Sequence, residues 1–377
     1  MEQEKFLRGV HHYLRLISLY LNKQEDPEYE INKGKLSFFL KLSKHHSLRA
    51  LFYQVLKNTK VKISDDDLNS LESYYVANVK KTIGFEQERK ALYQYLNENQ
   101  IDFLPLKGII LKDYYIDPCT REFADNDILF PNDKSDLIKA FFVNRDYKVE
   151  MFKRTNHDIY LKAPFYNFEM HRDLFFDVEG NEKNITYFKE PLKSAPVKEG
   201  YEHYLSNEDF YIYFTAHSYK HYRHSGCGIR TLIDYYVFLK NNKLDFEYIN
   251  NELAKLNLVD FSNQISSLSL KVFNNEPLTK EEEEMLLYIA SSGTYGTIEH
   301  SAEKGVQEKG KFRYLMSRLF PPYSFYKTTY PWAYKCPILI PLAWLMRFFR
   351  ILFTNPRKAT QEIKAISKQK KEKTKKQ

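Results

Sequence analysis

Residues 101–130 read IDFLPLKGIILKDYYIDPCTREFADNDILF, and this segment sets the architecture of the middle of the chain. A short apolar run, 101–106, ends at Lys107-Gly108, and residues 109–115 then place apolar side chains at helical spacing. Asp117-Pro118 stops that helix. Residues 125–130 are again a short apolar run. The segment therefore predicts a strand, a tight turn, a helix and a second strand.

The flanking sequence extends this core in both directions. Downstream, 134–143 has helical spacing, and three short runs that we interpret as strands follow at 147–152, 157–162 and 166–174. Upstream, helical spacing covers 4–96 and predicts four or five helices, one beginning at Ser64. After the core, helical spacing returns at 207–239 and continues to 289, and 291–310 is expected to be a loop.

The expected fold class is therefore α+β, with a small mixed β-sheet flanked by an N-terminal and a C-terminal helical unit. We expect four parts with boundaries uncertain by a few residues: an N-terminal helical unit, 1–98; the sheet-containing core, 99–180; a C-terminal helical unit, 181–310; and an apolar, aromatic segment with a basic tail, 311–377.

Composition places the chain among ordinary globular proteins. It has 377 residues, of which 43% are hydrophobic and 28% charged, so a core can form. The three cysteines, Cys119, Cys227 and Cys336, are odd in number and far apart, which argues against a disulfide framework or a cysteine metal cluster. The N-terminus has no signal-peptide pattern, and we expect a cytoplasmic location.

The positive charge lies mostly at the C-terminus. Residues 357–377 hold nine Lys or Arg and two Glu, so 9 − 2 = +7 of the total +8 belongs to them. A specific nucleic-acid-binding surface is therefore not expected. The apolar run 336–353 contains Arg347 and Arg350 and is not expected to cross a membrane. Two interpretations of 336–377 stay open: an interfacial helix and tail on the inner membrane face, or a helix packed on the domain with a solvated tail.

The residues best suited to chemistry lie at the second strand. Asp125 and Asp127 are one residue apart, so alternation puts both carboxylates on one face, where two like charges favour a cation. Mg²⁺, or Mn²⁺, is the expected ion because it takes oxygen ligands and substrate phosphates. Lys107-Gly108 lies at a strand-to-helix turn, where backbone N–H groups can face a phosphate.

Other polar residues could complete this site. Glu169 and His171 alternate on a later strand and share a face. They could add a third carboxylate and a neighbouring imidazole to the site, or they could belong to a salt-bridged surface strand. His217 and His221 are four apart on a helix, but no matching zinc motif accompanies them. They and Arg230 could line a nucleotide cleft, or His217 could form a structural hydrogen bond with Asp234.

These motifs together resemble the bacterial nucleotidyltransferase family that is placed in the DNA polymerase β-like superfamily. The segment after the core is similar to the helical region of that family. The residues that carry the resemblance are Leu106-Lys107-Gly108, Tyr115, Pro118, Arg121, Asp125-Asn126-Asp127-Ile128-Leu129, Phe168-Glu169-Met170-His171, His217-Ser218-Tyr219-Lys220-His221, Arg230, Leu232 and Asp234.

The resemblance implies a metal-dependent transfer of a nucleoside monophosphate from a nucleoside triphosphate (NTP) to an acceptor that the sequence does not identify. Asp125 and Asp127 match the metal ligands, and Glu169 matches the third catalytic acid. The triphosphate would lie against Lys107, Gly108 and Arg121, with His171, His217, His221 and Arg230 as further nucleotide contacts.

Two departures from the family pattern keep other functions open. Ile109 stands where a serine usually follows the glycine, and Glu169 stands where aspartate is commoner. The first departure favours a catalytically silent nucleotide-binding or scaffold protein that docks through its C-terminal segment. A phosphotransferase with another donor would also use a carboxylate pair and an anion-binding turn.

Overall fold

The computed structural model describes residues 2–176, 182–224, 226–294, 302, 305–306 and 309–354. The chain divides into two compact units, one with the described residues of 1–219 and 228–294, the other with those of 220–227 and 295–354. Part of the loop expected at 291–310 and the whole basic tail, 357–377, lie outside the described residues.

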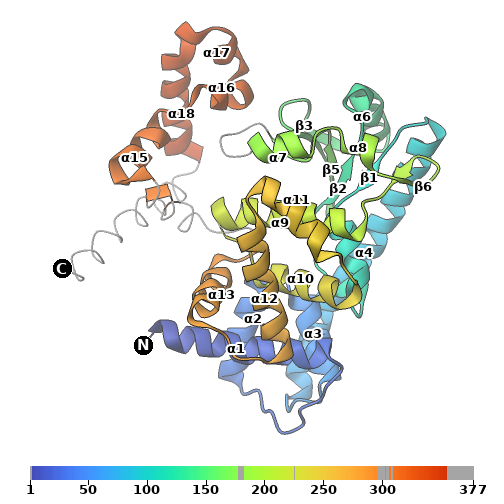
Figure 1. The fold of residues 1–377 in the computed structure, drawn as a ribbon, viewed down its shortest axis with the longest axis vertical. Helices are drawn as coiled ribbons and strands as arrows, with labels where there is room; N and C mark the ends of the chain where they lie inside the picture. The colour runs from blue at the N-terminus through green and yellow to red at the C-terminus, as the bar shows by residue number, and fades with distance from the viewer. Residues whose placement is uncertain are drawn as a thin grey trace. The chain divides into compact units, whose positions relative to one another are not determined.

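Four helices form the N-terminal part of the first unit (Figure 1). The start predicted at Ser64 is confirmed, because the Ser64 side chain accepts a hydrogen bond from the backbone N–H of Asp67. The long helix that follows reaches the sheet. The helices are α1 (Glu2–Leu21), α2 (Lys33–His45), α3 (Arg49–Asn58) and α4 (Asp65–Glu98).

The middle of the chain is a five-stranded mixed sheet with strand order β1-β2-β5-β4-β3. β2 and β5 are parallel, and the other neighbours are antiparallel. This architecture confirms the predicted α+β class. The strands are β1 (Leu104–Pro105), β2 (Asn126–Leu129), β3 (Lys148–Met151), β4 (His157–Lys162) and β5 (Tyr166–His171), with α5 (Gly108–Leu111) after β1 and α6 (Ser135–Val143) after β2.

One face of the sheet is a hydrophobic core. Ile128, Phe168 and Met170 of β2 and β5 are fully buried in one cluster with Phe85 of α4 and Phe142 of α6. Because side chains alternate along a strand, the residues between them point to the opposite face. Those residues include the predicted site residues of β2 and β5.

The rest of the first unit is helical apart from a two-stranded sheet, β6 and β7, that the sequence did not predict. The helical pattern at 207–239 forms two helices, and Gly226 and Gly228, which the sequence places in a turn, lie between them. The elements are α7 (Glu182–Tyr187), α8 (Pro191–Ser194), β6 (Val197–Glu199), β7 (Glu202–His203), α9 (Asn207–His224), α10 (Ile229–Asn241), α11 (Phe246–Leu256), α12 (Val259–Asn274) and α13 (Lys280–Ser292).

The second unit is a set of short helices around a small aromatic cluster that includes Tyr326, Tyr330 and Ala343. In the described part of the chain, no helix is both long and apolar enough to cross a bilayer, as expected for 336–353. The helices are α15 (Lys311–Leu319), α16 (Tyr323–Thr329), α17 (Pro331–Lys335) and α18 (Ile340–Thr354).

Candidate active site

The three predicted acidic residues lie together on the polar face of the sheet. Asp127 of β2 is directly beside Glu169 of the parallel strand β5. Asp125 lies two residues before Asp127, on the same side, and the two carboxylates influence each other electrostatically. Alternation within each strand predicted that the acidic residues of that strand lie on one face. The pairing of β2 with β5 brings the residues of the two strands together.

Asp127 is almost fully buried and is held by two cationic or donor groups. Its Oδ1 atom accepts hydrogen bonds from Lys107 Nζ at 2.7 Å and from His171 Nε2 at 2.7 Å. Burial alone would raise the pKa of Asp127, but Lys107 and His171 outweigh it and hold the pKa below its usual range. Burial would lower the pKa of Lys107, and the Asp127 charge raises it instead. The pair is therefore ionised.

The environment of Asp125 shifts its pKa in the opposite direction from that of Asp127. Asp125 is only partly exposed, and among the described residues it makes no hydrogen bond or ion pair. Burial and the neighbouring charge of Asp127 raise its pKa, and the charges of Lys107 and Arg230 only partly oppose this. A carboxylate in this position is stabilised by an added cation.

The turn before α5 places Lys107 in an uncommon backbone conformation. Lys107 has φ +47° and ψ −114°, a region that costs a residue with a side chain about 1–3 kcal/mol. Gly108 follows, and a Cβ atom there would lie 2.7 Å from Nη1 of Arg121. The glycine therefore makes room for Arg121. The predicted helix begins as the four-residue α5, so the turn offers only a short helix end to an anion.

Arg121 has a buried structural partner. Its Nε donates to Asp234 Oδ1 at 2.8 Å and its Nη2 to Asp234 Oδ2 at 2.9 Å. Tyr115 Oη also donates to Asp234 Oδ1, at 2.7 Å. The Arg121–Asp234 pair joins the loop after α5 to helix α10. The hydrogen bonds described for Asp234 come from Arg121 and Tyr115, and its pairing with His217 stays a prediction.

Two further cations act on Asp125. Lys81 of α4, which belongs to no sequence motif, attracts Asp125 and lies over the Phe85 ring at 5.4 Å. Burial is the main cause of its lowered pKa. Arg230 donates a hydrogen bond to the carbonyl oxygen of Glu122 and lowers the pKa of Asp125. Lys81 lies four residues before the buried Phe85, and only that helical spacing could have indicated that it faces inward.

The two predicted histidines of α9 belong to different units. His217 lies in the first unit, one turn after Tyr213, with ring centroids 6.2 Å apart. Tyr213 is buried. Burial raises its pKa, and the charges of Lys107, Asp127 and Glu169 also influence that pKa. His221, at the end of α9, belongs to the second unit.

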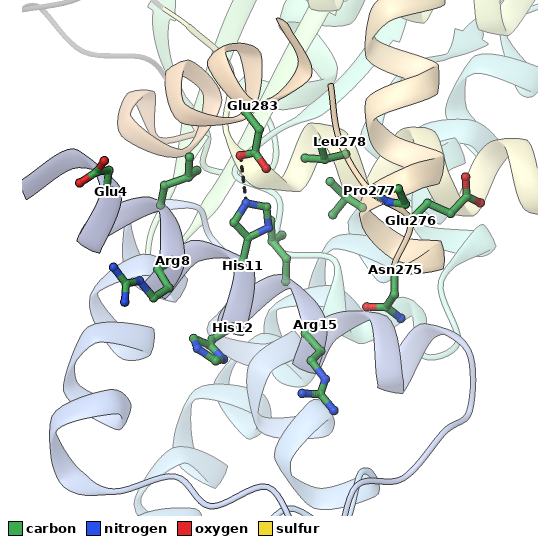
Figure 2. A pocket seen from close by; sticks show the side chains of 13 residues that line it. Glu4, Arg8, His11, His12, Arg15, Asn275, Glu276, Pro277, Leu278 and Glu283 are labelled. Carbon is green, nitrogen blue, oxygen red and sulfur yellow. Dashed lines mark hydrogen bonds and ion pairs between the residues drawn. The ribbon is translucent and has the colours of Figure 1, made fainter. Parts of the chain in front are cut away.

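A pocket elsewhere in the first unit contains none of these residues. It has a volume of about 740 Å³ and lies between α1 and the connection from α12 to α13 (Figure 2). Its polar lining includes Arg8, His12 and the pair His11–Glu283, whose Nε2 and Oε2 atoms are 3.0 Å apart.

A small mixed sheet with carboxylates on two adjacent parallel strands, beside a lysine, is an arrangement suited to group transfer. The chain belongs to a family described as uncharacterised nucleotidyltransferase, whose model matches residues 32–274. This region includes the sheet and every predicted site residue. The match confirms the predicted family and the general activity of nucleotidyl transfer. No curated protein and no solved structure matches the chain significantly.

Proposed function

We propose that this protein transfers a nucleoside monophosphate from an NTP to an acceptor, using divalent metal ions held by Asp125, Asp127 and Glu169. The observation that carries the proposal is the state of Asp125, a partly buried carboxylate beside a like charge and without a hydrogen-bond partner among the described residues. The family match supports the transfer itself.

The donor set fits Mg²⁺ or Mn²⁺. Lys107 and His171 both contact Oδ1 of Asp127, so Oδ2 accepts no hydrogen bond within the described chain. Together with Asp125 and the adjacent Glu169, it offers oxygen ligands of the kind that hard cations prefer. A bound ion would stabilise the charge that develops on the α-phosphate and on the leaving pyrophosphate.

The protein groups have separate roles in this reaction. The acceptor oxygen forms a bond to the α-phosphorus, the bond from that phosphorus to the oxygen bridging the β-phosphate breaks, and pyrophosphate leaves. In this proposal Glu169 takes the acceptor proton or holds a second ion. Lys107 stays protonated because Asp127 raises its pKa, so it can neutralise phosphate charge. Arg230 and Lys81 add positive charge beside Asp125.

Replacing Lys81 should weaken nucleotide binding without weakening the fold. Lys81→Met keeps the aliphatic contact with Phe85 and removes the charge beside Asp125. A charged hydrogen bond to phosphate contributes about 1.5–3 kcal/mol, so KM for the NTP should rise at least about tenfold. Steady-state kinetics measure this. Lys80→Met, on the exposed side of α4, is the matched control and should leave KM unchanged.

Ligand-dependent melting tests the nucleotide site before the acceptor is known. The wild-type protein should gain stability with one or more ribonucleoside triphosphates plus Mg²⁺ or Mn²⁺, by about 2.7 kcal/mol when the nucleotide is at 100 times its Kd. Asp125→Asn should lose the metal-dependent part of that gain. Equal gains in both proteins, or none in either, would favour the catalytically silent scaffold.

Isotope position separates the two transfer reactions. With α-labelled NTP, a nucleotidyltransferase moves the label to the acceptor, and with γ-labelled NTP it releases the label as pyrophosphate. A phosphotransferase would give the reverse, with γ-label on the acceptor. Cell extract can supply the acceptor in this assay, and Asp125→Asn run in parallel identifies background labelling.

A second property is favoured by the surface of the second unit. We propose that α18 and the basic segment after it dock on an anionic lipid surface. Leu342, Leu345, Phe348 and Phe349 of α18 are each about half exposed, and Arg347 and Arg350 lie on the same helix. Residues 357–377 add a net charge of +7, which complements an anionic surface. Trp344 of the same helix packs against the aromatic cluster.

Vesicle cosedimentation of the full chain checks this proposal. Binding should occur with vesicles containing phosphatidylserine, weaken with salt, and be much lower with phosphatidylcholine alone. Replacing Phe348 and Phe349 by serine should reduce binding at least about tenfold, since each aromatic side chain contributes about 1.5–3 kcal/mol when buried. Ile116→Ser, at an exposed position of the first unit, is the control. Equal binding to both kinds of vesicle, or unchanged binding of the double variant, would contradict docking on anionic lipid.

A further inference from the structure

We infer that His157, Glu169 and His171 form a site for a first-row transition-metal ion on the polar face of the sheet, next to Asp127. This inference rests on the proposed function in one respect, because Glu169 belongs to both sets of ligands. It adds two nitrogen ligands, His157, to which the sequence gave no role, and His171, which was expected to contact the nucleotide, and it predicts which metals the enzyme selects.

The three side chains come from adjacent strands in register. His157 of β4 lies directly opposite His171 of β5, and Glu169 is two residues before His171 on the same face. Nε2 of His157 is 3.7 Å from Oε2 of Glu169, and Nε2 of His171 is 3.9 Å from the same oxygen. The three ligand atoms all lie within 4.8 Å of one another. An ion between them needs only small side-chain movements.

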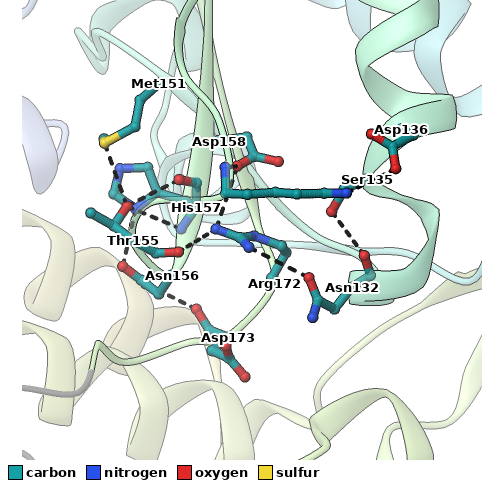
Figure 3. Close-up of polar contacts among 11 residues, drawn as sticks. Asn132, Ser135, Asp136, Met151, Thr155, Asn156, His157, Asp158, Arg172 and Asp173 are labelled. Atoms are coloured by element: carbon teal, nitrogen blue, oxygen red, sulfur yellow. Dashed lines mark hydrogen bonds and ion pairs between the residues drawn. The ribbon is translucent and has the colours of Figure 1, made fainter. Parts of the chain in front are cut away.

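The orientation of His157 is fixed by the residue before it (Figure 3). Nδ2 of Asn156 donates to the carbonyl oxygen of Asp173 at 2.9 Å, so Oδ1 of the same amide faces Nδ1 of His157 at 3.2 Å. Because that oxygen is an acceptor, Nδ1 carries the proton in this contact, and Nε2, which faces Glu169, is the nitrogen that would bind a metal ion. Histidine ligands in metal sites are commonly oriented in this way by a second residue.

A buried hydroxyl group lies near the same charges. Tyr213 of α9 is 1% exposed, and its Oη has no hydrogen-bond partner among the described residues. Burial is the main cause of its raised pKa, and the charges of Asp127 and Glu169 contribute. The phenol therefore stays neutral. It can donate to an acidic oxygen or to water on a bound ion, which would account for a buried polar group here.

The ligand types select the ion. Two imidazoles and one carboxylate are typical of first-row transition metals, whereas Mg²⁺ favours oxygen ligands alone. His171 Nε2 also contacts Asp127 Oδ1 at 2.7 Å, so an ion on this nitrogen would replace the shared proton and release it to solvent. The ion would then lie beside the carboxylates proposed to act on the nucleotide.

Metal titration of the metal-stripped full chain, without nucleotide, tests the site. Calorimetry with MnCl₂, ZnCl₂ and MgCl₂ should show one transition-metal site per chain, with Mg²⁺ binding much more weakly. His157→Gln should weaken Mn²⁺ and Zn²⁺ binding at least about tenfold. Asn156→Ala keeps all three ligands and should weaken binding by about 10–100-fold through lost orientation.

A matched control is present in the same chain. His11 and Glu283 form another histidine–carboxylate pair, with a nitrogen-to-oxygen distance of 3.0 Å, far from these strands in sequence and in a different pocket. His11→Gln should leave metal affinity unchanged. Melting curves of each metal-free variant confirm that it is folded before the titration.

The outcomes separate this inference from the proposed function. Absence of a transition-metal site in wild type, or equal affinity in wild type and His157→Gln, would overturn the inference and indicate a His157–Glu169 salt bridge. NTP-dependent stabilisation with Mg²⁺ would then persist and leave the proposed function standing. Mn²⁺ binding that His157→Gln abolishes, together with no response to any NTP, would support the metal site and contradict the proposed function.

Discussion

Asp125→Asn is expected to reduce nucleotidyl transfer by about 10³-fold while the metal-free protein melts at the same temperature as wild type or higher. The loss of activity follows from the loss of a charged metal ligand, since electrostatic stabilisation of a transition state is typically reduced 10²–10³-fold when one such group is removed. The variant differs from wild type only in one oxygen and its charge.

The stability result follows from the pKa shift of Asp125. Burial and Asp127 raise this pKa, so the ionised carboxylate is less favourable in the folded protein than in the unfolded chain. At neutral pH the ionised group therefore opposes folding, and the neutral asparagine removes that cost. Asp127→Asn is a less clean test, because it takes away the partner of the partly buried Lys107 and of His171.

Activity and melting are measured side by side for wild type, Asp125→Asn and a surface control. Asp133→Asn serves as the control because its side chain is 72% exposed and pairs only with the neighbouring Lys134. A clear drop in the melting temperature of Asp125→Asn would mean that Asp125 stabilises the fold, and near-normal transfer would mean that the metal site lies elsewhere.

The strands and the polarity of the sheet faces were predictable because they depend on local periodicity. The predicted strand at 157–162 coincides with β4, and the alternation around Asp127 and Glu169 places each on the polar face. That the two residues are direct neighbours was not predictable from spacing. It depends on the parallel pairing of β2 with β5, which only the packed sheet sets.

The contact partners of the site residues were harder to predict from the sequence. Arg121 was predicted to contact phosphate, and the structure gives it Asp234, 113 positions away. His157 was placed on a strand without a role, because its function depends on the register with β5. Lys81 is one lysine in a long helix, and only its spacing from Phe85 indicates that it faces inward. Contacts between distant elements decide all three positions.

The small sheet of β6 and β7 shows the same limit, whereas the turn between α9 and α10 was indicated by the sequence. Gly226 and Gly228 interrupt the apolar spacing of 207–239 there. In the structure a Cβ atom on Gly228 would lie 2.8 Å from the backbone of Thr294, so close packing requires glycine there. The sequence therefore predicted the turn, while the tertiary contact with Thr294 gives the reason that glycine is needed at 228.

Asp234→Asn is expected to lower the free energy of unfolding by about 3–5 kcal/mol. The substitution leaves the Arg121 guanidinium buried without its counter-charge, and breaking a buried pair in this way is much more costly than losing a surface pair. Chemical denaturation of both proteins measures the difference. Glu28→Gln, at the exposed pair with Lys62, should change the free energy by less than about 1 kcal/mol.

The double variant Arg121→Met/Asp234→Leu identifies the role of Arg121. If the pair is structural, replacing both partners by apolar side chains restores much of the stability that Asp234→Asn loses, since well-packed apolar groups can substitute for a buried ion pair. Transfer activity should recover with it, because the pair positions the loop that ends at Asp125. If Arg121 instead binds the triphosphate, the double variant regains stability but keeps a raised KM for the NTP. Comparing stability and KM in the same variant therefore distinguishes a positioning residue from a nucleotide contact.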